Sequence, residues 1–104
     1  MSRLDTLRRI AAQRPTDPFP QYGLALELRA EGHLDDALQI FATLRTTAPD
    51  YVPQYLMHGQ ILVGLNRKDE ARAVMEEGRV VAARKGDGHA ASELAGALAE
   101  IEPD

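Results

Sequence analysis

Three histidines are the residues of this chain best suited to hold a metal ion. They are His33, expected in a turn, His58, expected inside a helix, and His89, expected near the start of a helix. A metal site on one helix needs a second histidine or a carboxylate one turn away, so that both ligands project from the same face. We expect none of the three histidines to have such a partner, and we therefore predict no metal site.

Two pairs of neighbouring acids are the other candidates for chemistry. Asp35 and Asp36 form one pair, and Asp69 and Glu70 form the other, 34 residues later. Two adjacent carboxylates could act as a general acid and a general base. Both pairs, however, are expected in the first turn of a helix, where the helix dipole favours negative charge. The chain also lacks a nucleophile elbow and a glycine-rich phosphate loop. We predict that the protein is not an enzyme and binds no cofactor.

The elements that position these residues repeat along the chain. When residues 18–51 are aligned with residues 52–85, matched positions carry similar residues at a constant offset of 34. Glycine and asparagine accept the left-handed conformation that ends a helix, so each copy is predicted to be a helix, a turn and a helix. A fixed period of this length is typical of a stacked helical solenoid. The matched pairs are Ala25 and Gly59, Leu28 and Leu62, Gly32 and Asn66, Ala37 and Ala71, and Phe41 and Met75.

This pattern resembles the tetratricopeptide repeat, which has the spacing W-x2-L-G-x2-Y, then A-x3-F, then P. The first copy matches at Leu24, Ala25, Leu28, Ala37, Phe41 and Pro49, and the second at Tyr55, Gly59, Leu62, Ala71 and Met75. Three positions depart from the pattern: Gln21 replaces tryptophan, His58 replaces leucine, and Ala83 replaces the closing proline. Because His58 stands at a leucine position, we expect it to be partly buried and hydrogen-bonded. The resemblance is to a small bacterial-type protein with two repeats and flanking helices.

The predicted fold class is all-α, an antiparallel helix-hairpin solenoid of about six helices. Periodic apolar residues and capping signals, such as the N-caps expected at Ser2 and Asp17, predict these helices. They are placed at residues 3–13, 18–30, 33–47, 52–65, 68–84 and 89–101. We predict one domain over residues 1–104. It would comprise an N-terminal capping helix at 2–14, repeats at 18–51 and 52–85, and a C-terminal capping helix at 89–102. Within the last helix, Ala91, Leu94, Ala95, Leu98 and Ile101 are expected to face inward.

Composition restricts the classes of partner. The chain is 44% hydrophobic and 27% charged, has a formal net charge of −4, and contains no cysteine. Nucleic-acid binding requires a basic face, so the negative charge argues against it. No apolar run approaches the ~20 residues of a membrane span, and we expect no secretory signal peptide. We therefore predict a cytoplasmic protein that binds neither nucleic acid nor membrane.

The resemblance implies a protein–protein interaction scaffold or adaptor, because such repeats bind partner segments on the concave face made by their first helices. The corresponding residues here form an apolar surface with a few polar edges, which we predict to bind a protein or peptide. An alternative is a self-associating structural unit, with a homodimer formed through the same face or through the end helices. The predicted surface comprises Phe19, Tyr22, Leu26, Arg29, Leu56, Gln60 and Val63.

Overall fold

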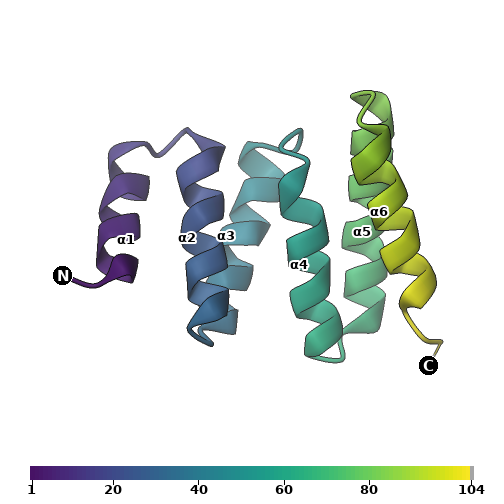
Figure 1. The fold of residues 1–104 in the computed structure, drawn as a ribbon, viewed down its shortest axis with the longest axis horizontal. Coiled ribbons are helices and arrows are strands. Elements are labelled where there is room, and N and C mark those ends of the chain that lie inside the picture. Colours follow the sequence, from purple (N-terminus) through teal and green to yellow (C-terminus); the bar gives the residue numbers. More distant parts are fainter. Residues whose placement is uncertain (104) are drawn as a thin grey trace. The chain divides into compact units, whose positions relative to one another are not determined.

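The computed structural model describes residues 1–103, which form six α-helices and no strand (Figure 1). The fold class predicted from the sequence, an all-α helical repeat, is therefore confirmed. The predicted ends of all six helices agree with the observed ends to within one residue. The helices are α1 (Arg3–Gln13), α2 (Pro18–Ala30), α3 (Leu34–Thr47), α4 (Pro53–Gly64), α5 (Lys68–Arg84) and α6 (Gly88–Glu100).

The chain divides into two compact units. Unit 1 extends from Met1 to Tyr51 and contains α1, α2 and α3, whereas unit 2 begins at Val52 and contains α4, α5 and α6. The division falls at the predicted boundary between the two repeats. That both units belong to one domain stays a prediction.

Side-chain caps begin three of the helices. Ser2 and Asp5 form a capping box on α1, in which the backbone N–H of Asp5 donates to the Ser2 hydroxyl oxygen at 3.0 Å. Asp17 accepts a hydrogen bond from the Phe19 N–H at 3.0 Å at the start of α2, directly before a proline that has no N–H to satisfy. Asp87 caps α6 in the same way, by accepting from the Ala90 N–H at 3.0 Å.

The helix ends follow from glycine, asparagine and proline. Gly32 after α2 and Asn66 after α4 have φ values of +83° and +59°, the left-handed conformation expected at these matched positions. The second helix of the first repeat, α3, instead ends at Ala48, which precedes Pro49 and has an extended φ of −143°. A residue before proline is pushed out of the helical region, so the helix stops there. Where Ala83 replaces this proline, α5 continues to 17 residues, against 14 for α3, and Gly86 ends it at a φ of +76°.

Small residues let the two helices of each hairpin approach closely. In unit 1, Ala25 of α2 and Ala37 of α3 are completely buried. In unit 2, Ala71 is completely buried, and a Cβ added at Gly59 would lie 2.6 Å from Cγ of Met75. A side chain larger than these would force the helices of the hairpin apart, because protein interiors are close-packed.

The last helix packs through a narrower stripe than the sequence predicts. Leu94 is buried, and Ala91, Leu98 and Ile101 are half-buried, as expected for an inward-facing stripe. Ala95, however, is exposed, so the prediction that it faces inward is wrong. It lies about 100° around the helix from Leu94, outside the strip that the neighbouring helices α5 and α4 cover.

We expect replacement of Ala37 or Ala71 with leucine to destabilise the protein by about 1–3 kcal/mol, because the added atoms overpack the hairpin. The controls are Ala42→Leu and Ala73→Leu, which place the same side chain at exposed positions of α3 and α5. Urea denaturation measures the free energy of unfolding of each variant. Equal stability of the buried and exposed variants would contradict the close approach of the helices.

A second pair of substitutions tests glycine in two helices of unit 2. A Cβ at Gly78 would lie 2.6 Å from Cγ of Tyr55 and 3.1 Å from Cδ1 of Leu94, whereas a Cβ at Gly96 would meet no atom within 4 Å. Gly96→Ala should therefore stabilise by about 1 kcal/mol through helix propensity alone. Gly78→Ala should instead destabilise by about 1 kcal/mol or more, because overpacking exceeds the same propensity gain. Thermal melts that shift in the same direction for both variants would refute this difference.

Candidate partner-binding surface

In unit 1, the predicted surface residues lie along α2 at intervals of three and four residues. We call Phe19, Tyr22, Leu26 and Arg29 the α2 face. The side of α2 that packs in the core carries Leu24, Ala25 and Leu28, all buried. On the α2 face, Phe19 is 70% exposed and the other three residues are half-buried. Phe19 is thus a large apolar side chain that the fold of unit 1 leaves mostly in solvent.

Tyr22 is more engaged inside unit 1 than the sequence predicts. Its ring lies 5.5 Å from the ring of Tyr51 and 6.2 Å from that of Phe41, both in edge-to-face arrangements. Burial raises the pKa of Tyr22, and the positive charge of Arg29 opposes this rise. Burial also raises the pKa of Tyr51, and Tyr22 and then Asp17 add to that effect. Tyr22 therefore supports the fold and leaves only part of its ring exposed.

In unit 2, the predicted residues lie on the exposed side of α4. We call Leu56, Gln60 and Val63 the α4 face. Leu56 is half-buried, Gln60 is exposed, and Val63 is 38% exposed. The opposite side of α4 is buried over six positions, which are Gln54, Tyr55, His58, Gly59, Ile61 and Leu62. The α4 face is therefore less apolar than the α2 face, and it carries no exposed ring.

The histidines lie in three different settings. His33 is exposed at the start of α3, and His58 is buried on α4. His89 and Glu93 lie one turn apart on α6, with Nε2 and Oε1 2.9 Å apart. The expectation that no histidine has a carboxylate partner one turn away is therefore wrong for His89. Within residues 1–103, no group of three or more His, Cys, Asp or Glu side chains is placed to hold a metal ion.

The paired acids lie in the first turns of α3 and α5, as predicted. In α5 they also form local ion pairs: Asp69 accepts from Arg72 at 2.8 Å, and Glu70 accepts from Arg67 at 2.7 Å. The hydrogen bond from Arg67 lowers the pKa of Glu70, which keeps this carboxylate charged. In α5 both carboxylates of the pair are thus held by neighbouring arginines at the start of the helix.

No helix of the described residues has both the length and the apolar character required to cross a membrane.

We expect the two aromatic residues of the α2 face to differ in their effect on stability. Tyr22→Ala should lower the free energy of unfolding by about 2 kcal/mol, because it removes ring contacts with Phe41 and Tyr51. Phe19→Ala should change it by less than about 0.5 kcal/mol, because the exposed ring contributes little to packing. Urea denaturation of both variants measures this difference. A larger loss of unfolding free energy for Phe19→Ala than for Tyr22→Ala would contradict the conclusion that Phe19 is the exposed residue of the two.

Comparison with known proteins identifies the family. No protein-family model and no curated protein matches the sequence. A solution structure of a tetratricopeptide repeat domain protein from Salinibacter ruber shares 36% identity with this chain, covers 85% of this chain and 89% of its own, and has a TM-score of 0.81. A crystal structure of a tetratricopeptide repeat domain protein from the same organism shares 35% identity, covers 82% and 94%, and has a TM-score of 0.78.

A more distant structure agrees in fold. A protein from Bordetella parapertussis shares 22% identity, covers 97% of this chain and 88% of its own, and has a TM-score of 0.81. Tetratricopeptide repeat domains serve in general as non-catalytic protein-interaction modules. The repeated hairpins with small residues at their crossings, and the identity to the Salinibacter structures over most of their length, show that this chain belongs to the tetratricopeptide repeat family.

Proposed function

We propose that the protein is an interaction module that binds a partner protein through the exposed sides of its first helices, the α2 face and the α4 face. The observation that carries the proposal is the exposure of Phe19. It is 70% exposed at the start of α2, although burying a phenylalanine ring is among the larger apolar gains available to a chain. Phenylalanine, like tyrosine and tryptophan, is enriched in the core of protein interfaces relative to the rest of the surface.

The spacing of the α2 face suits an elongated partner segment. Phe19, Tyr22, Leu26 and Arg29 recur at helical spacing, and ten residues of helix extend for about 15 Å. Phe19 would supply the main apolar contact, and the half-buried Leu26 and the exposed part of Tyr22 would extend it. A partner segment with apolar side chains at matching intervals would cover this strip and remove it from water. In unit 2, the α4 face by itself offers the apolar side chain of Val63 and the polar side chain of Gln60.

The proposal assigns no catalytic role to any residue of the chain. Self-association through the same faces is the competing hypothesis, and light scattering across a range of protein concentrations separates it from binding to a different protein. A cytoplasmic location stays a prediction.

Photo-crosslinking tests the proposal directly. Phe19 is replaced with the photoreactive residue p-benzoylphenylalanine, which preserves an exposed aromatic ring at this position. The matched control carries the same residue at Val80, which is 49% exposed on α5 and lies outside both proposed faces. After illumination in an extract of the source cells, mass spectrometry identifies the crosslinked proteins. We expect proteins captured from position 19 that are absent or at least about tenfold weaker from position 80.

A second control uses the same extract and a protein that carries both the photoreactive residue at position 19 and the substitution Leu26→Asp. A charge placed at the middle of the α2 face should abolish specific capture, because burying an unpaired carboxylate is costly. Circular dichroism confirms that the helical content is unchanged. Capture of the same proteins from positions 19 and 80, or capture that survives Leu26→Asp, would refute the α2 face as the binding surface.

A further inference from the structure

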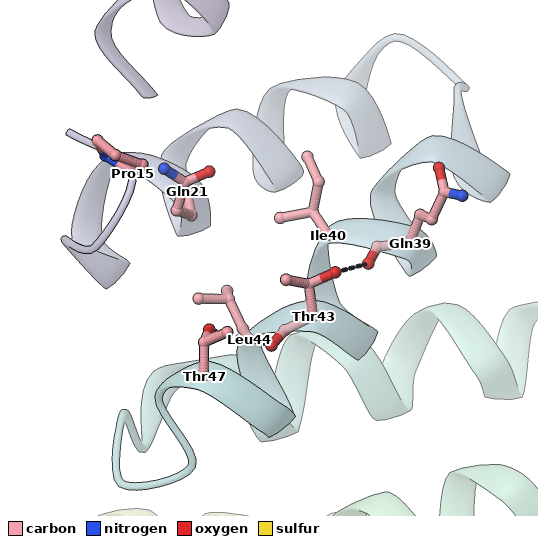
Figure 2. Close-up of a pocket in the computed structure, with 7 residues that line it drawn as sticks. All are labelled: Pro15, Gln21, Gln39, Ile40, Thr43, Leu44 and Thr47. Atoms are coloured by element: carbon pink, nitrogen blue, oxygen red, sulfur yellow. Dashed lines mark hydrogen bonds between the residues drawn. The ribbon is translucent and has the colours of Figure 1, made fainter. Parts of the chain in front are cut away.

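Unit 1 contains a pocket on a different part of its surface from the α2 face. The pocket has a volume of about 390 Å³, and we call it the α3 pocket because most of its walls belong to that helix (Figure 2). This volume is within the range of roughly 300–1,000 Å³ that is usual for sites that bind small ligands. The pocket is lined by Pro15, Gln21, Gln39, Ile40, Thr43, Leu44 and Thr47.

The walls of the α3 pocket are uncharged and combine apolar side chains with the polar side chains of two glutamines and two threonines. Leu44 is buried and Ile40 half-buried, so these two side chains supply an aliphatic floor. The hydroxyls of Thr43 and Thr47 donate to backbone carbonyl oxygens four residues earlier in α3, at 3.1 and 3.0 Å. Because each hydroxyl proton is engaged with its own helix, these threonines offer a ligand their methyl groups and hydroxyl oxygens but no donor. A charged ligand would lose hydration here without gaining an opposite charge.

One polar group has a fixed direction in the pocket. The amide nitrogen Nε2 of Gln21 donates to the carbonyl oxygens of Ala11, at 2.9 Å, and Arg14, at 3.2 Å. Two acceptors on this side require the NH₂ group, which settles the orientation of the amide. Figure 2 shows that Oε1 consequently points away from Pro15, toward the side of Ile40. No described residue donates a hydrogen bond to Oε1, so it offers a ligand one positioned acceptor.

In the second repeat, the positions that match Gln21 and Leu44 pack directly against each other. Gln21 corresponds to Tyr55 and Leu44 corresponds to Gly78 at the offset of 34. The ring of Tyr55 is completely buried, and it packs so closely on α5 that position 78 has no room for a Cβ. Unit 1 has an amide in place of that ring, and the α3 pocket lies beside it.

We propose that the α3 pocket binds a neutral aromatic ring that carries one hydrogen-bond donor, such as an indole or a phenol. The ring contacts Ile40, Leu44 and the threonine methyl groups, and its N–H or O–H donates to Oε1 of Gln21. The ring can belong to a free small molecule or to a tryptophan or tyrosine side chain of a partner protein. This site is separate from the proposed α2 face and does not depend on it.

Titration of the intact protein with indole, followed by ¹⁵N NMR, tests the proposal. We expect saturable shifts of the Gln21 side-chain NH₂ and of the Thr43 and Thr47 amides, with a Kd of about 1 mM or tighter for a ligand of this size. Benzofuran, which has nearly the same shape as indole but lacks the N–H donor, should bind about three- to tenfold more weakly. Equal affinity for the two compounds would overturn the assignment of Oε1 as the acceptor.

N-acetyltryptophanamide distinguishes the two sources of the ring. Binding of this compound to the same residues supports a side chain of a partner protein, because its indole is attached to peptide groups on both sides. Binding of free indole without binding of N-acetyltryptophanamide supports a small-molecule ligand. Both outcomes support the α3 pocket as a binding site. If neither compound causes saturable shifts, the proposal is refuted.

Two arginine substitutions on α3 give a matched control. Thr43→Arg introduces a large charged side chain at the pocket, whereas Thr46→Arg introduces it at an exposed position outside the pocket walls. We expect Thr43→Arg to weaken indole binding at least about tenfold and Thr46→Arg to leave it unchanged, with equal helical content by circular dichroism. Equal binding by both variants would overturn the site. Photo-crosslinking from position 19 measures binding to the α2 face and is independent of indole binding. Either proposal can therefore fail while the other is still tested.

Discussion

Close approach of two antiparallel helices is the constraint on which each repeat of this protein depends. Ala25 and Ala37 in unit 1, and Ala71 in unit 2, have no exposed surface. At Gly59 and Gly78 even a single additional carbon would collide with a neighbouring side chain. A helix pair this close excludes water from its apolar residues with few large side chains, which suits a chain with five aromatic residues. The rest of each repeat must keep the two helices at this separation.

The same constraint decides which residues remain for binding. In each repeat, one side of the first helix is buried against the second helix. Only the other side can contact a second molecule. On α2, Phe19 is consequently exposed to solvent. Tyr22 packs against the rings of Phe41 and Tyr51 but remains partly exposed. A substitution at Tyr22 therefore alters both the packing and the surface of unit 1, whereas one at Phe19 alters the surface and leaves the packing of unit 1 intact.

The two repeats fill matched positions with different side chains. At the aromatic position the second repeat has Tyr55 packed against Gly78, and the first has Gln21 near Leu44. A large and a small residue have thus been exchanged for two of intermediate size. In the first repeat the amide of Gln21 also ties α2 to the last turn of α1 through the carbonyl oxygens of Ala11 and Arg14. Gln21, which departs from the family pattern, thus links α2 to α1 and adds a polar side chain to the wall of the α3 pocket.

The sequence by itself determined the helices and their ends. Capping at Ser2 and Asp17, the left-handed turns at Gly32 and Asn66, and the stop before Pro49 depend on backbone rules that act over a few residues, and all agree with the structure. The contact between His89 and Glu93 was also present in the sequence as a spacing of four residues. Counting that spacing would have predicted it.

Only the tertiary structure decided which side chains meet across helices. The contact of Tyr22 with Tyr51, the exposure of Ala95 and the walls of the α3 pocket are set by how one helix rotates and packs against another. Helical periodicity gives the side of a helix on which a residue lies, but it does not give the width of the strip that a neighbour covers. Residues at the edge of that strip, such as Tyr22 and Ala95, are buried or exposed according to how their neighbouring helices pack. The order of residues along the chain carries no information about the distances between packed helices.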